Sequence, residues 1–172
     1  MREIYEVLIR GVLDALSIEY TQELNRFSFL YDGCHRYAYA KTDMTALEEG
    51  IQTDFYHPLR IDVKEAEDAR KLLASVNEVL THGSYTLSER GEMVFHIAIH
   101  IENNQPIMKK THAMRLTLVQ EAVLFNLSSA CILRAVCSEE SDRARLLEQL
   151  RQDLPSWKQS LNEIPWSPEA EE

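Results

Sequence analysis

The sequence has few of the residues that build flexible linkers or special binding loops. It contains only five glycines and five prolines among 172 residues, which argues against a long linker or a low-complexity insert. It also has no GxGxxG, P-loop, GxSxG or HExxH pattern. These absences disfavour a nucleotide-binding loop, a serine hydrolase and a zinc protease. We therefore expect a protein that is not an enzyme and that holds no cofactor and no metal.

Cysteine is also scarce, and its spacing excludes the usual redox and zinc motifs. The three cysteines, Cys34, Cys131 and Cys137, form no CxxC pair, and their number is odd. Free thiols in a reducing compartment are the expected state. The first residues include acids where a signal peptide needs a basic region, and the longest uncharged run, Ala122 to Leu133, is too short to span a bilayer. These features predict a cytoplasmic protein that does not enter a membrane.

The charge balance is strongly acidic, with a formal net charge of −10. Nucleic acids and anionic membranes bind clustered Lys and Arg, so neither is an expected partner. Acids outnumber bases again over residues 139–172. A solvated acidic face is the simplest interpretation, and an acidic patch for a basic partner is the alternative.

Hydrophobic periodicity predicts an α+β fold in which helices pack on an antiparallel sheet of about five strands, in the order α-β-β-β-α-β-β-α, followed by a C-terminal helix. We expect one domain over 1–157 and a fraying acidic tail over 158–172. The expected elements are a helix over 3–17, a hairpin around Asp32-Gly33, a helical turn over 42–50, a strand over 51–63, a helix over 64–82, a hairpin over 85–101, a long helix over 111–137 and an amphipathic helix over 140–154.

The register of the first hairpin depends on the length of its turn. A two-residue turn at Asp32-Gly33 puts Phe29 opposite Arg36. A three-residue turn that includes Cys34 puts Phe29 opposite Tyr37 and gathers the aromatic side chains on one face. Because a half-buried sheet separates apolar from polar faces, we favour the three-residue turn.

The second hairpin contains the candidate binding residues. Met93, Phe95, Ile97, Ile99 and Ile101 alternate along its return strand and form the expected buried face. The opposite face consists of Val94, His96, Ala98 and His100, and we predict that these four residues contact a partner. On a strand the two histidines start roughly 13 Å apart, so they are not expected to ligate one metal ion together.

One stretch of the sequence resembles a known family. It contains Arg60-Ile61-Asp62-Val63, the helix Ala69 to Leu80 with its Asn77, the passage Gly83 to Ser88, and Gly91-Glu92-Met93-Val94-Phe95. In order and wording this is similar to the YbjN family of proposed bacterial sensory transduction regulators, and the architecture also resembles the type III secretion chaperones. The resemblance implies a non-enzymatic protein that dimerises or binds another polypeptide.

The leading hypothesis is therefore a protein-binding adaptor, chaperone-like or regulatory, that acts on another polypeptide. Two alternatives remain open: a small-ligand-binding or enzymatic domain that uses the His96/His100 face, and an acidic, antitoxin-like immunity protein. The helices at 3–17 and 111–137 carry more apolar surface than one sheet face can cover. We therefore expect a homodimer or a stable complex built on helical surface, with the acids of 139–172 around its rim.

Overall fold

The computed structural model describes residues 2–31, 40–80, 83–100 and 106–162. Its elements are α1 (Arg2–Ala15), β1 (Tyr20–Glu23), β2 (Arg26–Tyr31), β3 (Ala40–Ala46), β4 (Ile51–Arg60), a 3-10 turn (Val63–Glu65), α2 (Ala66–Val79), β5 (Ser84–Leu87), β6 (Glu92–Ile99), α3 (Ile107–Val136) and α4 (Glu140–Asn162).

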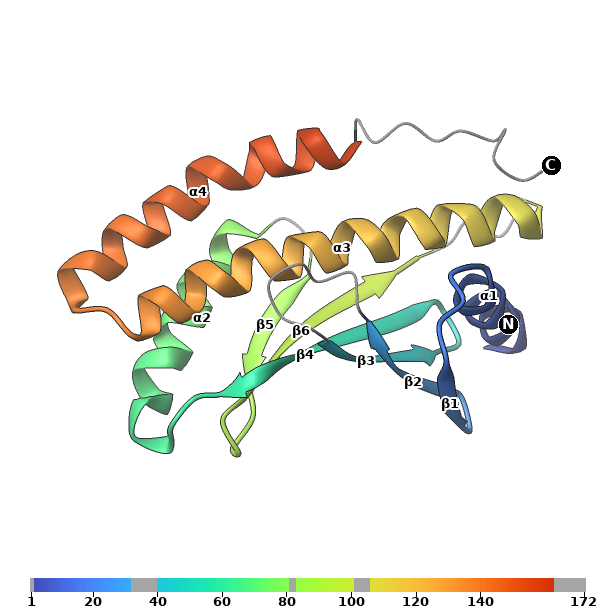
Figure 1. Ribbon diagram of the computed structural model, residues 1–172, viewed down its shortest axis with the longest axis horizontal. Helices are drawn as coiled ribbons and strands as arrows, with labels where there is room; N and C mark the ends of the chain where they lie inside the picture. The colour runs from blue at the N-terminus through green and yellow to red at the C-terminus, as the bar shows by residue number, and fades with distance from the viewer. Residues whose placement is uncertain (1, 32–39, 81–82, 101–105, 163–172) are drawn as a thin grey trace.

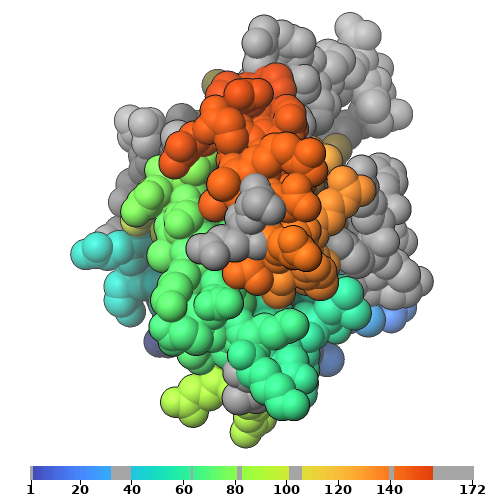
Figure 2. Space-filling view, turned by 90° about the vertical axis from the view of Figure 1, so that its left-hand side faces the viewer, coloured from blue at the N-terminus to red at the C-terminus, as the bar shows by residue number. Residues whose placement is uncertain are grey.

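The strands form one antiparallel sheet in the order β1-β2-β3-β4-β6-β5. The helices α1, α2 and α3 lie on the same face of this sheet, and α4 lies on the far side of α3 from the sheet (Figure 1). At the end where α3 turns into α4, α4 lies beside α2 (Figure 2), and Arg143 forms an ion pair of 3.5 Å with Asp68. The predicted α+β class is confirmed, and the described part of the chain forms six strands where about five were expected.

The core is built around a row of ring side chains that crosses the sheet on its inner, helix-covered face. Neighbouring strands place Phe29, Thr42, Phe55, Phe95 and Tyr85 in one cross-strand row. The rings of Tyr85 and Phe95 stack with centroids 4.6 Å apart. Because side chains alternate along each strand, all of these residues lie on the inner face of the sheet. They form the surface on which α3 packs.

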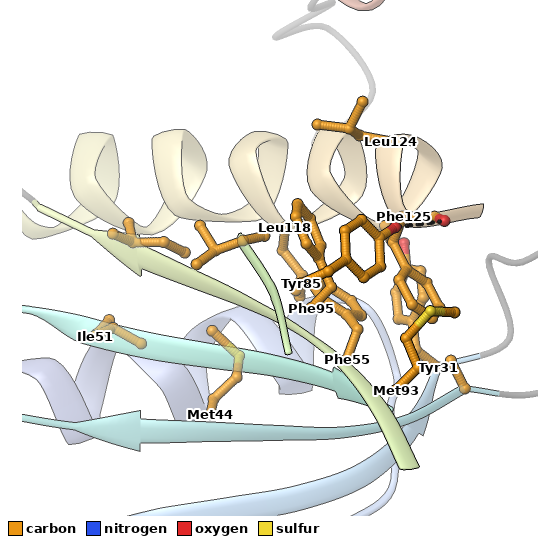
Figure 3. Close-up of a cluster of buried hydrophobic side chains, with 14 of the residues drawn as sticks. Tyr31, Met44, Ile51, Phe55, Tyr85, Met93, Phe95, Leu118, Leu124 and Phe125 are labelled. Carbon is orange, nitrogen blue, oxygen red and sulfur yellow. Dashed lines mark hydrogen bonds between the residues drawn. The ribbon is translucent and has the colours of Figure 1, made fainter. Parts of the chain in front are cut away.

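α3 packs on this row through both apolar and polar contacts. Phe125 of α3 stacks on Phe55 with a centroid distance of 5.6 Å (Figure 3). The Tyr85 hydroxyl donates to the Phe125 carbonyl at 3.2 Å and also bonds the Ser128 hydroxyl. Because a buried phenol needs a hydrogen-bond partner, this pair fixes where α3 crosses β5.

α3 is also the one helix, among the described residues, that is long and apolar enough to cross a membrane by length and composition. An 18-residue window within it has a mean hydropathy of 1.6, and half of that window is buried inside the protein. The sheet lies under one side of α3, and Leu150 and Leu154 of α4 are buried on the core. This burial is typical of the core helix of a soluble protein.

Two expectations for the first half of the chain are wrong. Phe29 pairs with Thr42, so neither of the registers considered for the first hairpin occurs. Residues 42–46 belong to β3, where a helical turn was expected, and only the stretch from Leu47 to Gly50 turns back into β4. The residues from 32 to 39, which include Cys34, Arg36 and Tyr37, lie outside the described residues.

The second half of the chain follows the prediction more closely. Met93, Phe95, Ile97 and Ile99 are buried on the inner face, as expected, and Ile101 lies outside the described residues. α3 begins at Ile107, directly after Pro106, and α4 continues through Pro155 to Asn162. The boundary at residue 157 between domain and tail stays a prediction.

Candidate functional site

A row of polar side chains crosses the outer face of the sheet, the face opposite the helices. Cross-strand pairing places one polar residue from each strand side by side: Thr21, Ser28, Asp43, Asp54, His96 and Ser84. This polar row lies one residue along from the buried aromatic row, because side chains alternate between the two faces. It contains His96, the central residue of the predicted binding face.

Two carboxylates lie directly opposite each other in the polar row, which is unfavourable unless each has a cationic partner. Asp43, which is 1% exposed, forms an ion pair with Arg26 and lies 3.8 Å from the Lys41 ammonium. Burial raises the pKa of the Asp43 carboxyl, but the neighbouring Ser28 hydroxyl, the Arg26 guanidinium, the Tyr56 hydroxyl and the Lys41 charge together hold it below its ordinary value. Asp43 is therefore a buried, charged anchor for this half of the row.

Tyr56 and Lys41 cover the buried carboxylate. Burial, together with the negative charge of Asp43, raises the pKa of Tyr56 to about 12, so its phenol stays protonated at neutral pH. The Lys41 ammonium lies 4.8 Å from the centroid of the Tyr56 ring, in cation–π geometry. The side chains of this half of the outer face are thus held in place by contacts within the chain.

In the other half of the polar row, Asp54 and His96 form a hydrogen-bonded chain of three residues with Thr86, which lies beside the row on β5. Nδ1 of His96 lies 2.8 Å from Oδ1 of Asp54, and Nε2 lies 2.6 Å from Oγ1 of Thr86. With a proton on Nδ1, the ring donates a hydrogen bond to the Asp54 carboxylate, and its Nε2 accepts a hydrogen bond from the Thr86 hydroxyl. This is the order of hydroxyl, base and orienting acid that activates a nucleophile in acyl-transfer enzymes. Asp54 also accepts a hydrogen bond of 3.0 Å from Gln52.

The four predicted binding residues do not form one accessible surface. His96 is partly exposed and bonded on both ring nitrogens, while Ala98 and His100 are exposed. Val94 is 6% exposed and therefore offers little contact area, although it was expected to be accessible. Nδ1 of His100 lies 3.3 Å from the carbonyl oxygen of Glu49, at the end of the sheet. The absence of a metal shared by the two histidines stays a prediction.

A second candidate surface, which we name the apolar end, gathers exposed apolar side chains at one end of the molecule. α1, the first turns of α3, and the β1–β2 and β3–β4 turns all lie toward this end (Figure 1). They carry six of the eight large apolar side chains that are strongly exposed among the described residues. These six are Ile4, Val7, Leu24, Leu47, Ile107 and Met108.

Leu24 occupies an unfavourable backbone conformation at the tip of the β1–β2 turn. Its φ is 55°, in the left-handed region that leucine rarely adopts, and it is 87% exposed. The turn is held by bonds from Gln22 to the Leu24 carbonyl at 2.8 Å and from Asn25 to the Ala46 carbonyl at 2.6 Å. Arg10 of α1 in turn donates to Gln22 at 2.9 Å. Strained backbone conformations cluster at functional sites, which makes Leu24 a candidate for recognition.

The apolar end also contains a groove of about 610 Å³ between the last residue of α1 and the first turns of α3. Ala15 lines one side of it, and residues between 107 and 115 line the other. α1 and α3 lie side by side next to the groove, since a Cβ added to Gly11 would be in ordinary van der Waals contact with the Thr111 methyl group, at 3.5 Å.

The sequence pointed to His96 but not to its partners or to the apolar end. Asp54 and Thr86 belong to other strands, and only the register of β4, β6 and β5 brings them to His96. A period-2 pattern could have placed Thr86 on the outer face. Leu24 gave no signal, because the turn it occupies usually contains Asn or Gly.

Comparison with solved structures finds a similarity of fold. The crystal structure of YbjN from E. coli, described as a proposed transcription regulator, matches with a TM-score of 0.48 and 11% sequence identity, over 71% of this chain and 89% of that one. No protein-family model matches the sequence, and no curated protein matches it. The weak resemblance stated from the sequence is thus found again in the structure, and at this TM-score it carries no information about function.

Proposed function

We propose that this protein is an adaptor or regulator that binds another polypeptide through its apolar end. The observation that supports this function best is the concentration of exposed apolar side chains on α1, α3 and two neighbouring turns. Scattered apolar side chains are normal on a protein surface, whereas their concentration at one end of a molecule favours an interaction site there. The predicted use of helical surface for association fits the same end of the molecule.

The composition of the apolar end favours a polypeptide partner. The patch spans four separate elements, and its members are aliphatic, so they offer area and shape without a hydrogen-bonding pattern for a small ligand. Exposed acids, including Glu23, Glu48 and Glu49, lie beside it on the same turns and form a polar rim. A partner with an apolar centre and basic margins would complement this surface.

Matched substitutions to glutamate test the proposal. Met108→Glu and Leu24→Glu place a charge at the apolar end, whereas Leu59→Glu places the same charge on an exposed leucine of β4 outside it. Light scattering at micromolar concentration measures self-association. For a heteromeric partner, the captured protein is purified and its affinity is remeasured. We expect the first two variants to weaken binding by tenfold or more, on the order of 1.4 kcal/mol each, and the control to leave it unchanged.

Equal affinities for all three variants and the unsubstituted protein would contradict the proposal. A monomer at all concentrations, with no purified partner that depends on Met108, would contradict it as well. If self-association alone is lost in the Met108→Glu variant, the partner is a second copy of this chain.

The relay of Thr86, His96 and Asp54 favours a second candidate function, the transfer or hydrolysis of an acyl group. In that reaction the Thr86 hydroxyl oxygen would bond to the carbonyl carbon of an ester, and its proton would pass to Nε2 of His96. His96 would then give the proton to the departing alcohol, and water would release the acyl group by the same steps in reverse order. Asp54 would hold the ring through Nδ1.

Hydrolysis of an activated p-nitrophenyl ester tests this candidate. The rate is compared between the unsubstituted protein and the Thr86→Val, His96→Gln and Asp54→Asn variants. His100→Gln, which changes the exposed histidine directly after β6, is the control. A true relay loses its activity in all three variants and keeps it in the control. A rate that does not depend on Thr86 would exclude the reaction.

A further inference from the structure

β4 contains a bulge at residues 57–59. The pairing of β4 with β6 is regular up to Tyr56 and resumes at Arg60. Their partners on β6 are Val94 and Glu92, which are separated by a single residue. Three residues of β4 therefore lie opposite one residue of β6, and backbone groups of these three leave the hydrogen-bond ladder of the sheet.

The side chain of His57 holds the bulge in place of the ladder. Pro58 has no backbone N–H. The Leu59 amide donates to Nδ1 of His57 at 3.1 Å, and Nδ1 also lies 3.3 Å from the Leu59 carbonyl oxygen. A ring nitrogen accepts a hydrogen bond only while it carries no proton. The bond from the Leu59 amide therefore requires a neutral ring with its proton on Nε2.

The surroundings of His57 also favour the neutral ring. The side chain is 4% exposed on the inner face of the sheet, and the ring of Phe125 on α3 lies 6.1 Å away. Burial lowers the pKa of His57, and the contact with the Leu59 backbone opposes this only in part. A proton on Nδ1 thus places a charge in a buried and largely apolar environment. Titratable side chains on the elements around the bulge include Tyr31 of β2, Tyr85 of β5, Glu121 of α3, and Arg60 and Glu92, which pair with each other at 2.6 Å.

The backbone of the bulge, in contrast, is open to water. Leu59 is 55% exposed, and Pro58 is also exposed. Water can therefore replace Nδ1 of His57 as the acceptor for the Leu59 amide. The strand pairs at Tyr56 and Arg60 do not depend on this bond. The bulge is thus a segment that can open while both of its ends stay paired.

We propose that His57 is a pH-sensitive switch for the bulge of β4. Protonation of Nδ1 breaks the hydrogen bond from the Leu59 amide, because two donors then face each other. Residues 57–59 open and the charged ring turns out to water, while β4 stays paired with β6 on both sides of the bulge. At neutral pH the ring returns and the bulge closes. The switch is independent of the proposed partner surface, because Leu59 lies outside the apolar end.

Proton linkage gives the direction and size of the effect. In the open bulge the ring is solvated and has its ordinary pKa of 6.5, whereas in the closed bulge its pKa is lower. The open form therefore binds more protons below pH 6.5. Its population relative to the closed form rises by up to about tenfold for each pH unit below that value, until the pKa of the closed form is reached. Above the ordinary pKa the closed form is favoured, and the ratio no longer changes with pH.

Amide hydrogen exchange of the full chain, followed by NMR between about pH 7.5 and pH 5, tests the switch. Each rate is compared with the intrinsic exchange rate at the same pH. We expect the protection of the Leu59 amide to fall by up to about tenfold per pH unit, in step with the titration of the His57 ring. The amides of Phe55 and Phe95, which lie in the regular part of the sheet, should keep their protection.

Two variants separate the switch from other effects of acid. His57→Asn keeps an acceptor for the Leu59 amide but cannot titrate, so the protection of Leu59 should no longer depend on pH. His100→Asn, at an exposed histidine directly after β6, should leave the pH dependence unchanged. The comparison of Leu59 with the His57 ring in the unsubstituted protein decides the proposal even if His57→Asn does not fold.

Constant protection of the Leu59 amide while the His57 ring titrates would overturn the proposal, because the protonated ring would then stay in place and bond the Leu59 carbonyl. Equal loss of protection at Phe55 and Phe95 would overturn it as well, since acid would then unfold the sheet as a whole. A pH dependence that persists in the His57→Asn variant would assign the opening to another group, with the same consequence.

Discussion

At the scale of single residues, backbone conformation affects how much a residue contributes to the free energy of folding. Leu24 has a positive φ without being glycine, and its side chain is almost fully exposed, so it gains little from packing to offset the strain. A leucine in the left-handed region costs roughly 1–2 kcal/mol relative to its preferred conformations. The strained residue lies at the apolar end, which is the surface that we propose binds a partner.

We predict that Leu24→Asn makes the protein more stable and weakens its interaction with a partner. Asn tolerates the left-handed region, so the free energy of unfolding should rise by about 0.5–1 kcal/mol. Denaturant titration measures this change. Leu30→Asn, at an exposed leucine of β2 without a positive φ, is the matched control and should not raise stability. A variant of Leu24 that is less stable than the original protein would show that the turn depends on the leucine side chain.

Glycine at 91 is required by its surroundings as well as by its φ of 76°. A Cβ at this position would lie 2.1 Å from the backbone oxygen of Ile61, which is far inside contact distance. The Gly91 carbonyl also accepts a hydrogen bond of 2.9 Å from the Ile61 amide. The β5–β6 turn therefore lies against the backbone at Ile61, directly after β4. A glycine at position 91 is what allows this close contact.

At the scale of elements, Asn77 shows how a helix closes the edge of the sheet. Its side-chain amide donates to the Tyr85 carbonyl at 2.9 Å, and its side-chain oxygen accepts from the Tyr85 amide at 2.7 Å. The asparagine thus makes the two bonds that a further strand would make with β5. Edge strands left open pair with other chains, and α2 prevents this on one side of the sheet.

We expect Asn77→Ala to lower the free energy of unfolding by about 2 kcal/mol, because two backbone groups of Tyr85 lose their partners. The same change should increase aggregation during refolding. Thermal unfolding and turbidity measure the two effects. Ser75→Ala, on the same helix, removes only a bond to the helix's own backbone and is the control. Equal stability of the two variants would mean that water replaces the asparagine at the strand edge.

The sequence predicts elements well where one face of an element is apolar and the other polar. β6 alternates except at Val94, and its inner-face residues Met93, Phe95, Ile97 and Ile99 were found in advance. β3 does not, because Thr42 and Asp43 are both buried at the centre of the sheet, where a run of polar residues resembles a turn. β1 is short and mostly exposed, so burial leaves no pattern in it.

The candidate sites were predictable only in part for a similar physical reason. An outer-face position for His96 follows from alternation within one strand. Its contacts with Asp54 and Thr86 depend on the registers of two further strand pairs, which a single sequence does not determine. The apolar end depends on how α1, α3 and two turns meet in space, and no local pattern records this.

At the scale of the whole molecule, the response to acid is set by buried groups more than by the net charge. His57 lies 4% exposed on the inner face of β4, with its ring 6.1 Å from that of Phe125. Burial lowers the pKa of His57, and its contact with the Leu59 backbone only partly opposes this. The Leu59 amide donates to Nδ1 at 3.1 Å, a bond that fits the neutral ring.

The sign of the effect follows from proton counting. Below the ordinary pKa of 6.5, the unfolded chain protonates His57 and the folded chain does not. The unfolded state then binds more protons, so stability is fully present above pH 6.5 and is lost as pH falls from there toward the lower pKa of the folded state. The slope approaches about 1.4 kcal/mol per pH unit for one fully excluded proton. Asp43, whose pKa is also lowered, contributes only below its ordinary value of 3.8.

We therefore predict that the free energy of unfolding falls between pH 7 and pH 5.5, and that His57→Asn removes most of this fall. Asparagine offers an acceptor to the Leu59 amide but no titrating group, so the two pH profiles should converge as pH decreases. Urea titrations at closely spaced pH values measure both profiles, and His100→Asn, at an exposed histidine, should keep the original slope. An equally steep fall after His57→Asn would contradict the prediction, because the acid sensitivity would then come from groups other than His57.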